Sequence, residues 1–410
     1  MSENAQKPRI RLKGFSDAWE QRKVGDLLIE RNQQAPMSDE YPLMAFIANE
    51  GVAPKGERYD RSSLVTDTVN KLYKKTEKGD FIYSSNNLET GSIGLNKHGK
   101  ACISPVYSIF EPTGIADSDF LGRRLVRKDF INAMVKWRQG VIYGQWRIHE
   151  SDFLKIEIPI PSVEEQRKIG AYLDQLDNLI TLHQRKYDKL VAVKKALLEK
   201  MFPADGETVP KIRFKGFSDA WEQRKLDYYL EVSNIKNTDN TFTKEDVLSV
   251  SGDFGVVNQI EFQGRSFAGV SVSNYGIVQT GDVVYTKSPL KANPFGIIKT
   301  NKGKTGIVSV LYGVYHTKER ANANFIQTYF EQDARLNNYL RPLVNKGAKN
   351  TLLISDTDAL AGEVCFAPTL TEQCSVGQFF ATLDNLITLH QRQLEKLKNI
   401  KSALLEKMFV

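Results

Sequence analysis

The sequence is poor in cysteine and has no long apolar run. Its three cysteines, Cys102, Cys365 and Cys374, are spaced unlike the ligands of a zinc module, and an odd number of thiols fits a reducing compartment. No stretch approaches the roughly 20 apolar residues that a membrane-spanning helix needs. The first residues also lack the apolar core of a signal peptide. These absences predict a soluble, cytoplasmic protein without a structural disulfide.

Motifs for catalysis are also lacking. Gly303-Lys304-Thr305 resembles the end of a phosphate-binding loop, but Ile298 stands where the opening glycine is required. Asn293-Pro294-Phe295 lacks the second proline of the adenine-methyltransferase motif. The sequence contains no Asp-x-Lys or Glu-x-Lys triplet of a nuclease, and its five histidines show no metal-ligand spacing. We therefore expect no enzyme activity, no metal site and no cofactor in this chain.

What the sequence does contain is an internal repeat. Residues 9–24, RIRLKGFSDAWEQRKV, return at 211–226 as KIRFKGFSDAWEQRKL, with differences at three positions. LDNLITLHQR at 176–185 returns unchanged at 383–392, and ALLEKMF at 196–202 returns at 403–409. The stretches between these blocks barely match, although GDFIY at 79–83 corresponds to GDVVY at 281–285. Repeated sequence blocks that flank dissimilar stretches predict two domains of one fold, as a chain of 410 residues also favours.

Two long amphipathic helices are expected, one closing each repeat. From Ser162 to Phe202, and again from Thr369 to Val410, apolar residues alternate in steps of three and four, the heptad pattern of a coiled coil. A helix of about 38 residues would be about 57 Å long and needs a partner along its length. Because the first helix leads into the second domain and the second helix leaves it, the two can pair only when antiparallel, around a pseudo-twofold axis. The residues expected on these helices at subunit or helix interfaces are Leu173, Leu176, Leu179, Ile180, Leu182, Tyr187, Leu190, Leu197, Phe380, Leu383, Leu386, Ile387, Leu389, Leu394, Leu397 and Leu404.

The two regions between the repeated blocks have the pattern of mixed α and β structure. Short β-rich runs such as FIYSS at 81–85 and VVYTK at 283–287 lie between glycine and asparagine turns. Helices are expected near residues 129–137 and 324–340. The predicted fold class is α+β, with two similar mixed α/β domains separated by two long helices that form an antiparallel intramolecular coiled coil. We expect the domains at 1–160 and 204–367, and the helices at 161–203 and 368–410.

Basic and polar residues gather on predicted loops of both domains. The net charge of +7 and the pI near 9.0 favour a polyanionic partner. In both domains these loops combine cations that bind phosphate with side chains that read base edges. A solvated surface explains any single lysine, whereas the loops as sets favour contact with nucleic acid. The candidate DNA-binding residues are Arg58, Tyr59, Arg61, Ser85, Asn86, Asn87, Lys97, His98, Lys100, Tyr143, Gln145, Trp146, Arg147, Tyr285, Lys287, Ser288, Lys291, Asn293, Lys299, Lys302, Lys304, Lys346, Lys349 and Asn350.

The repeated motifs resemble those of the specificity subunit of Type I restriction–modification enzymes, and the likeness covers nearly the whole chain. The pattern of that family is two variable target-recognition domains, each followed by a conserved helix. In this sequence the motifs are GFSDAWEQRK opening each domain, Ile158-Pro159-Ile160-Pro161 with Glu165-Gln166 entering the first helix, Ala367-Pro368 with Glu372-Gln373 entering the second, and LDNLITLHQR in both. The two entrances differ after Glu-Gln, where the first copy has Arg167-Lys168-Ile169 and the second has Cys374-Ser375-Val376.

The resemblance implies a non-catalytic subunit that binds double-stranded DNA. Its two target-recognition domains would read a bipartite, asymmetric target, one domain for each half-site. It also implies two methyltransferase (modification) subunits as partners and two restriction (motor-nuclease) subunits in the full complex. The adenine methyltransferase and ATP-dependent endonuclease activities would belong to those partners.

Two alternatives come from other classes of protein. A stand-alone sequence-specific DNA-binding protein, such as a repressor, would use the same two domains without an enzyme. Apolar residues outside the mutual seam of the helices, such as Leu179 and Leu386, favour a further partner that a repressor does not require. A purely structural coiled-coil tether would leave the two different sets of basic loops without an explanation.

Overall fold

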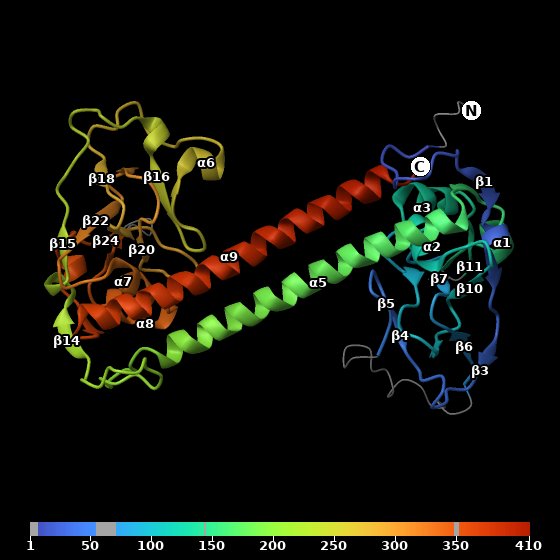
Figure 1. Cartoon of the computed structure of the whole chain (residues 1–410), viewed down its shortest axis with the longest axis horizontal. Helices are drawn as coiled ribbons and strands as arrows, with labels where there is room; N and C mark the ends of the chain where they lie inside the picture. The colour runs from blue at the N-terminus through green and yellow to red at the C-terminus, as the bar shows by residue number, and fades with distance from the viewer. Residues whose placement is uncertain (1–6, 55–70, 143–144, 348–351) are drawn as a thin grey trace. The chain divides into compact units, whose positions relative to one another are not determined.

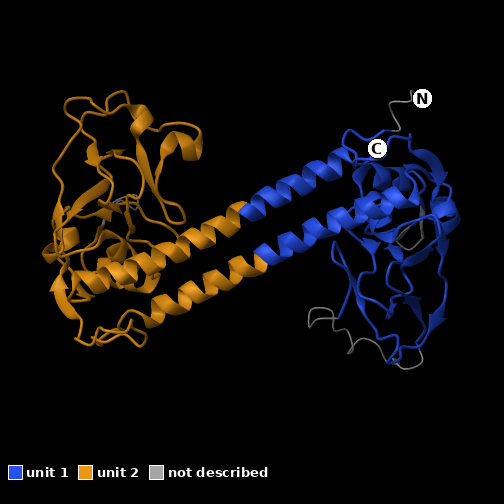
Figure 2. Ribbon diagram, in the orientation of Figure 1, with its two compact units in different colours: residues 1–183, 393–410 blue, residues 184–392 orange. Residues whose placement is uncertain are grey.

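The computed structural model describes residues 7–54, 71–142, 145–347 and 352–410, and the chain divides into two compact units (Figures 1 and 2). Unit 1 comprises Met1–His183 and Gln393–Val410, and unit 2 comprises Gln184–Arg392. Each unit combines a mixed α/β domain with parts of two long helices, which confirms the predicted fold class. Within the described residues, every helix is too short or too polar to cross a membrane.

A four-stranded antiparallel sheet forms the centre of unit 1. Its order is β2 (Leu28–Glu30), β10 (Ser108–Pro112), β7 (Phe81–Tyr83) and β8 (Ile93–Leu95). A second sheet has the order β3 (Gln34–Ala35), β6 (Tyr73–Thr76) and β9 (Ala101–Ile103), and two hairpins pair β4 (Ala45–Ile47) with β5 (Gly51–Ala53) and β11 (Gln139–Ile142) with β12 (Gln145–Arg147). The helices of this domain are α1 (Val24–Leu27), α2 (Ser118–Arg124), α3 (Lys128–Val135) and α4 (Glu150–Phe153). The expected strand at 81–85 and the expected helix near 129–137 correspond to β7 and α3.

Unit 2 repeats the central sheet in the same order. The strands are β15 (Leu230–Val232), β22 (Tyr312–Thr317), β19 (Val283–Thr286) and β20 (Ile297–Thr300). Three two-stranded sheets pair β16 (Leu248–Ser251) with β17 (Gly255–Asn258), β18 (Gly276–Val278) with β21 (Gly306–Val308), and β23 (Asn345–Lys346) with β24 (Leu352–Leu353). The matching strand orders show that the two domains share a fold, as the correspondence of GDFIY at 79–83 with GDVVY at 281–285 predicts.

The helices of unit 2 depart from the sequence prediction at one place. The single helix expected near 324–340 is two helices, α7 (Ala323–Tyr329) and α8 (Asp333–Leu340); a third, α6 (Gln259–Gln263), follows β17. Three-residue 3-10 turns occur at Leu226–Tyr228, Lys244–Asp246 and Asp358–Leu360. Phe325 of α7 and Leu336 of α8 both belong to the main core cluster of this unit. A continuous amphipathic pattern could not reveal this turn.

A strand ribbon connects each domain to its long helix. In unit 1, β1 (Glu20–Lys23) pairs antiparallel with β13 (Glu157–Ile160), and in unit 2, β14 (Glu222–Lys225) pairs with β25 (Glu363–Phe366). Helices α5 (Val163–Lys200) and α9 (Leu370–Lys407) follow directly and have 38 residues each. Hydroxyls precede both starts: Ser162 Oγ accepts from the Glu165 amide and Thr369 Oγ1 from the Glu372 amide. The helix prediction is therefore confirmed to within a few residues at each end.

Within each unit the two helices run antiparallel. In unit 1 the start of α5 meets the end of α9, where Lys401 Nζ lies 2.5 Å from Asp177 Oδ1. In unit 2 the end of α5 meets the start of α9, where Lys194 Nζ lies 2.5 Å from Asp384 Oδ1. The two ion pairs are counterparts in the repeat, since LDNL at 176–179 corresponds to LDNL at 383–386. The same pairing is therefore made once in each unit.

Burial divides the predicted helix residues into two groups. Leu173, Leu176, Phe380, Leu383 and Leu394 are buried, and the other seam residues are half-buried. Four leucines remain exposed to 41–51%, which follows their predicted place outside the mutual seam. These exposed residues are Leu179, Leu182, Leu386 and Leu389.

The end of each long helix is packed into an aromatic cluster. In unit 1, Phe409 lies 5.3 Å from Phe120 and 6.5 Å from Trp19, measured between ring centroids. In unit 2, the counterpart Phe202 lies 5.5 Å from Phe325 and 5.7 Å from Trp221. Because Phe409 comes from the far end of the sequence, the core of unit 1 needs the end of α9.

Candidate nucleic-acid interface

The predicted DNA-binding residues fall into groups that differ in what the structure says of them. Arg58, Tyr59, Arg61, Tyr143, Lys349 and Asn350 lie outside the described residues. For Gln145, Trp146 and Lys346 only the backbone is described. Exposed side chains belong to Asn87, Lys97, His98, Lys100, Arg147, Lys291, Lys302 and Lys304, and half-buried ones to Ser85, Asn86, Lys287, Ser288 and Lys299. Tyr285 and Asn293 are buried.

Tyr285 belongs to the core and not to a surface loop. Its ring is 1% exposed because β19 is the third strand of the central sheet, and its hydroxyl donates to the Phe295 carbonyl at 2.6 Å. Burial raises the pKa of this hydroxyl. We therefore correct the sequence prediction and remove Tyr285 from the DNA-binding set.

Asn293 also has an internal role. Its Nδ2 donates to Asp333 Oδ1 at 2.8 Å at the start of α8, and its carbonyl accepts from the amides of Leu290 and Gly296. These bonds shape the loop between β19 and β20. The residue is 9% exposed, so it supports the loop that carries Lys291 rather than a base contact of its own.

One buried asparagine organises a basic loop in each unit. In unit 1, Asn96 Oδ1 accepts from the amides of His98 and Gly99, and its Nδ2 donates to the Gly99 carbonyl. In unit 2, Asn301 Oδ1 accepts from the Gly303 amide, and its Nδ2 donates to the Lys304 carbonyl. Sequence reasoning missed both residues, although Asn-Lys begins each loop, because the two loops are offset by three positions from the Gly-Asp alignment.

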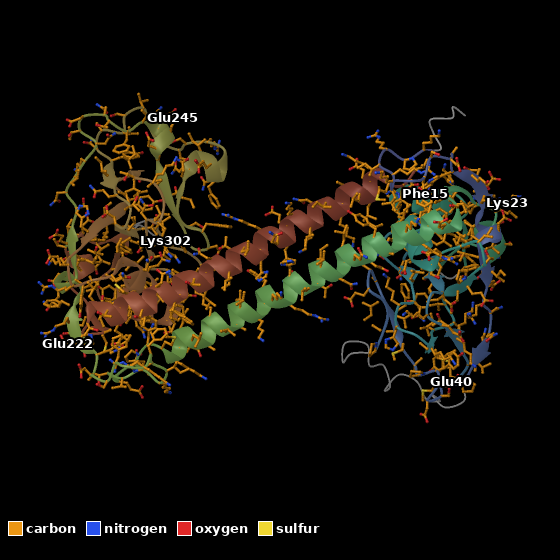
Figure 3. All side chains as sticks on the ribbon, viewed as in Figure 1. Phe15, Lys23, Glu40, Glu222, Glu245 and Lys302 are labelled. Atoms are coloured by element: carbon orange, nitrogen blue, oxygen red, sulfur yellow. The ribbon has the colours of Figure 1, made fainter. Side chains whose placement is uncertain are left out.

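The lysines after these asparagines meet different surroundings. Lys97 Nζ lies 3.3 Å from Asp174 on α5 and 3.7 Å from Asp119. The α9 position that corresponds to Asp174 is Ala381, and Lys302 has no ion pair among the described residues. Figure 3 labels this exposed side chain. The ammonium of Lys97 is therefore held by carboxylates, whereas that of Lys302 is exposed.

Three further predicted cations have partners or are partly shielded. Lys100 makes an ion pair with Glu40, labelled in Figure 3, and this bond raises the lysine pKa. Lys287 Nζ lies 2.8 Å from Asp356 Oδ1. Burial lowers the pKa of Lys299, although Glu331 opposes that shift. Arg147, in contrast, has a side chain that is 67% exposed and lies 4.0 Å from Glu150.

Exposed aromatic residues near α6 form a feature that sequence reasoning also missed. Phe254 follows β16 in the hairpin turn, is 56% exposed, and lies 5.2 Å from Phe262 between ring centroids. Phe267 is 57% exposed, with the Arg265 guanidinium 4.7 Å from its ring centroid. Exposed rings beside a cation suit contact with bases. No run of basic residues marks this segment, which is why the charge pattern did not indicate it.

Metal-ligating groups do not gather in the described part of the chain, where no set of three or more His, Cys, Asp or Glu side chains is placed to hold an ion. His316 Nδ1 instead lies 2.6 Å from Asp282 Oδ1 in the central sheet of unit 2. The exposed cations and aromatic rings are chemically suited to contact with a polyanion.

Comparison with known proteins agrees with these features. Residues 16–192 match the family model of the Type I restriction modification DNA specificity domain. A putative type I restriction enzyme MjaX specificity subunit from Methanocaldococcus jannaschii is 21% identical over 282 residues, which cover 64% of this chain and 60% of that protein. The MjaVIII specificity subunit of the same organism is 24% identical over 230 residues, covering 53% of this chain and 50% of that protein. The chain thus spans between half and two thirds of these curated relatives.

A solved structure extends the likeness of the fold over the whole chain. The S subunit of a Type I restriction-modification system from M. genitalium has a TM-score of 0.55 and 12% sequence identity, with 98% of this chain and 99% of that chain covered. The two chains therefore share a fold from end to end.

Proposed function

The chain belongs to the family of Type I restriction–modification specificity subunits, and we propose that it selects the DNA target of a modification complex. Each domain would read one half of a bipartite, asymmetric target in double-stranded DNA. The chain itself would be non-catalytic and cytoplasmic. Residues 1–160 and 204–367 would be the two target-recognition domains, and residues 161–203 and 368–410 the spacer helices.

The observation that carries this proposal is a common framework with different surfaces. Both domains have the same strand order, and both attach to a long helix through the same bidentate pair, Arg11 with Glu165 and Arg213 with Glu372. The loops differ: that after β7 contains SSNNLETGS, and that after β19 contains KSPLKANPF. Because direct readout depends on the side chains offered to the base edges, different loops favour different half-sites.

The proposed interface uses the residues that the structure leaves accessible. Lys302, Lys304 and Lys291 in unit 2 and Arg147 in unit 1 are exposed cations suited to phosphates or base edges. The exposed rings of Phe254 and Phe267 would add apolar groups, and Phe267 lies beside Arg265. Lys97 and Lys100 are exposed, but both form ion pairs with neighbouring carboxylates, so they would contribute less to DNA binding.

We propose that the exposed helix leucines hold the catalytic partners. Leu179 and Leu182 on α5 repeat as Leu386 and Leu389 on α9, each more than 40% exposed. Apolar side chains repeated on exposed helix faces are typical of protein interfaces. The partners would be two modification subunits, with two restriction subunits added in the full complex. A repressor would not need this surface, so the leucines favour the specificity subunit.

Co-purification with candidate modification subunits tests the proposed function. The full-length chain should form a complex that methylates adenine in host DNA at a bipartite sequence, whereas neither component alone should do so. Methylated adenines mapped across the genome would give the two half-sites. A chain that binds a defined DNA sequence but recruits no methyltransferase would support the repressor instead.

A further inference from the structure

The two units differ at the tip of one hairpin. The turn between β4 and β5 in unit 1 ends in Glu50, and the turn between β16 and β17 in unit 2 ends in Phe254. A glycine with a positive φ follows each of them. The hairpins are counterparts, because Val52 on β5 and Val256 on β17 pack in corresponding clusters beside the central sheet. A phenyl ring in unit 2 thus stands where unit 1 has a carboxylate.

The Phe254 ring is exposed but held in place. It is 56% exposed, although exposed aromatic side chains are unusual in a turn. The Phe254 amide donates to Ser251 Oγ at 3.3 Å, which closes the turn. Phe262 on α6, labelled beside β16 in Figure 1, lies 5.2 Å away between ring centroids. A ring supported in this way loses little conformational freedom when it binds a further molecule.

Phe254 lies at the end of the domain from which the loop after β19 extends. The Lys287 amide, at the start of that loop, donates to the Leu311 carbonyl just before β22 at 2.9 Å. The strand that leads to Leu311 is β21, and β16 runs parallel to it through a bridge between Val247 and Ile307. The turn after β16 and the turn after β21 therefore lie at the same end of their strands. We call this end of each domain the loop edge.

Unit 1 has a corresponding loop edge. The Asn49 amide in the hairpin turn donates to the Gly91 carbonyl in the loop after β7 at 3.0 Å. The Ile148 amide donates to Ser85 Oγ of the same loop at 3.1 Å, directly after the exposed Arg147. The hairpin turn thus lies beside loops that the sequence predicts to read DNA. The same position in unit 2 is held by Phe254.

The cations of the neighbouring segments favour DNA as the molecule that meets this ring. Lys291 is exposed in the loop after β19, and the Arg265 guanidinium lies 4.7 Å from the centroid of the Phe267 ring, just after α6. Cations beside an apolar wedge can bind the phosphates that flank an opened base step. Asp253, the residue before Phe254, can accept a hydrogen bond from the amino group of cytosine. The chemistry around the ring therefore suits both phosphates and bases.

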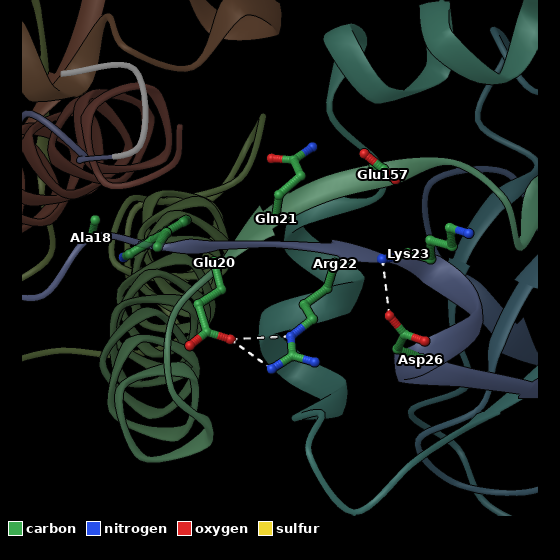
Figure 4. Close-up of a pocket in the computed structure, with 8 residues that line it drawn as sticks. Ala18, Glu20, Gln21, Arg22, Lys23, Asp26 and Glu157 are labelled. Carbon is green, nitrogen blue, oxygen red and sulfur yellow. Dashed lines mark hydrogen bonds and ion pairs between the residues drawn. The ribbon is translucent and has the colours of Figure 1, made fainter. Parts of the chain in front are cut away.

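A protein partner common to both units fits this ring less well. The surface that opens each domain shows what the two units share: Figure 4 shows it around β1 as open and polar. Arg22 Nη2 lies 2.7 Å from Glu20 Oε2 there, and Arg224 Nη2 lies 3.1 Å from Glu222 Oε2 in unit 2. The hairpin tip, in contrast, differs between the units. A feature of one unit alone suits contact with the half-site that this unit reads.

We propose that Phe254 inserts between two base pairs of the half-site read by unit 2, whereas unit 1 leaves its own half-site stacked. This inference rests on the proposed function and names the residue that would select one step of the target. Apolar wedges part neighbouring base pairs and kink the duplex. Pyrimidine–purine steps unstack most readily, so the inserted ring favours such a step without a hydrogen bond to its bases.

Base stacking in the complex of the full-length chain, the modification subunit and DNA tests the wedge. The duplex carries the bipartite target found by methylation mapping, with fluorescent 2-aminopurine in place of one adenine at a time. Exchange of residues 229–366 identifies the half-site of unit 2. The fluorescence of 2-aminopurine rises where a base loses its stacked neighbours. Anisotropy gives the DNA affinity, native mass spectrometry counts the modification subunits, and thermal unfolding monitors the fold.

The variants are chosen to separate the ring from its surroundings. Phe254→Ala removes the ring, Phe254→Glu introduces the residue of unit 1, and Phe254→Leu retains an apolar wedge. Glu50→Ala changes the corresponding position of unit 1. Val209→Ala is a control, because Val209 is an exposed apolar residue of unit 2 that lies before β14 and away from the hairpin.

We expect the unmodified complex to show raised fluorescence at one step of the unit 2 half-site, in addition to the adenines that are flipped out for methylation. Phe254→Ala and Phe254→Glu should abolish this signal and weaken target binding about tenfold, because stacking on the ring is lost. Phe254→Leu should keep most of the signal, since leucine also serves as a wedge. Glu50→Ala and Val209→Ala should keep it fully. The methylated adenines provide an internal reference in every variant.

The opposite results separate the wedge from the proposed function. A methylating complex in which the unit 2 half-site stays stacked, or in which the signal persists in Phe254→Ala and Phe254→Glu, would overturn the wedge alone. Loss of modification subunits from these folded variants, with DNA stacking unchanged, would assign the ring to a protein contact and overturn it too. An unmodified chain that supports no methylation at a bipartite sequence would overturn the proposed function, and the wedge with it.

Discussion

The attachment of each domain to its long helix depends on one buried carboxylate. Glu372 is 1% exposed, and its oxygens accept from Arg213 Nε and Nη2 at 2.7 and 2.8 Å, and from Trp221 Nε1 at 3.2 Å. Glu165 is equally buried in unit 1 and binds Arg11 in the same geometry. A buried carboxylate is costly unless its partners are complete. The pair therefore explains why Arg and Glu recur at equivalent positions of the two repeats.

Removing the arginine should leave that carboxylate buried and uncompensated. We expect Arg213→Ala to lower the free energy of unfolding by about 3 kcal/mol, whereas Arg224→Ala, which breaks an exposed pair, should change it by less than about 1 kcal/mol. Urea denaturation followed by circular dichroism measures both. Equal effects of the two substitutions would contradict the structural role of Arg213.

The two asparagine-organised loops should contribute unequally to DNA binding. Lys302→Ala should weaken binding to all sequences and reduce the salt dependence by about one phosphate contact, because this ammonium is exposed. Lys97→Ala should have a smaller effect, since Lys97 is held by Asp174 and Asp119. Binding isotherms at several salt concentrations give both slopes. A larger slope change for Lys97 than for Lys302 would show that the ion pairs do not persist on DNA.

The long helices show how far sequence alone can predict this fold. A heptad seam over more than thirty residues identifies α5 and α9 and their antiparallel pairing, because each helical turn repeats the same evidence. The repeat likewise predicts two domains of one fold. The environments of the loop residues were harder to predict from the sequence. The burial of Tyr285 depends on its strand lying inside the sheet, and the ion pair of Lys97 depends on a helix residue 77 positions away. Such contacts belong to the tertiary structure and leave no local pattern.

The end of α9 has a defined role in unit 1. Phe409 packs with Trp19 and Phe120, and Ile10 donates its amide to the Lys407 carbonyl at 3.0 Å. Ile212 makes the same bond to Lys200 at the end of α5, at 2.9 Å. Each helix end thus docks on the segment that opens a domain. The domain of unit 1 consequently depends on residues at both ends of the sequence.

Truncating this aromatic ring should destabilise unit 1. We expect Phe409→Ala to lower the free energy of unfolding by about 3 kcal/mol, since a buried phenyl group is lost and a cavity remains. The substitution Val410→Ala is the control, because Val410 is only half-buried. Hydrogen exchange should show faster exchange in the described strands of unit 1 and little change in those of unit 2. Uniform loss of protection in both units would indicate that they unfold as one.

Across the whole molecule, one set of structural elements is repeated and carries two different sets of loops. The strand ribbons, the Arg–Glu attachments and the helix ends recur in both units, whereas the loops after β7 and β19 do not. Under the proposed function, the repeated framework would offer each domain the same kind of attachment to a partner. The different loops would give each domain its own DNA preference. We therefore expect the two domains to read their half-sites independently.

Exchange of one domain tests whether the two domains read DNA independently. Residues 27–160 would be replaced by the matching region of a related chain, and methylated adenines would be mapped in a host that supplies the modification subunit. We expect a new sequence in one half-site and an unchanged sequence in the other. The reciprocal exchange of residues 229–366 should alter the other half-site alone. A single exchange that changes both half-sites, in a complex that still assembles and methylates DNA, would contradict independent reading by the two domains.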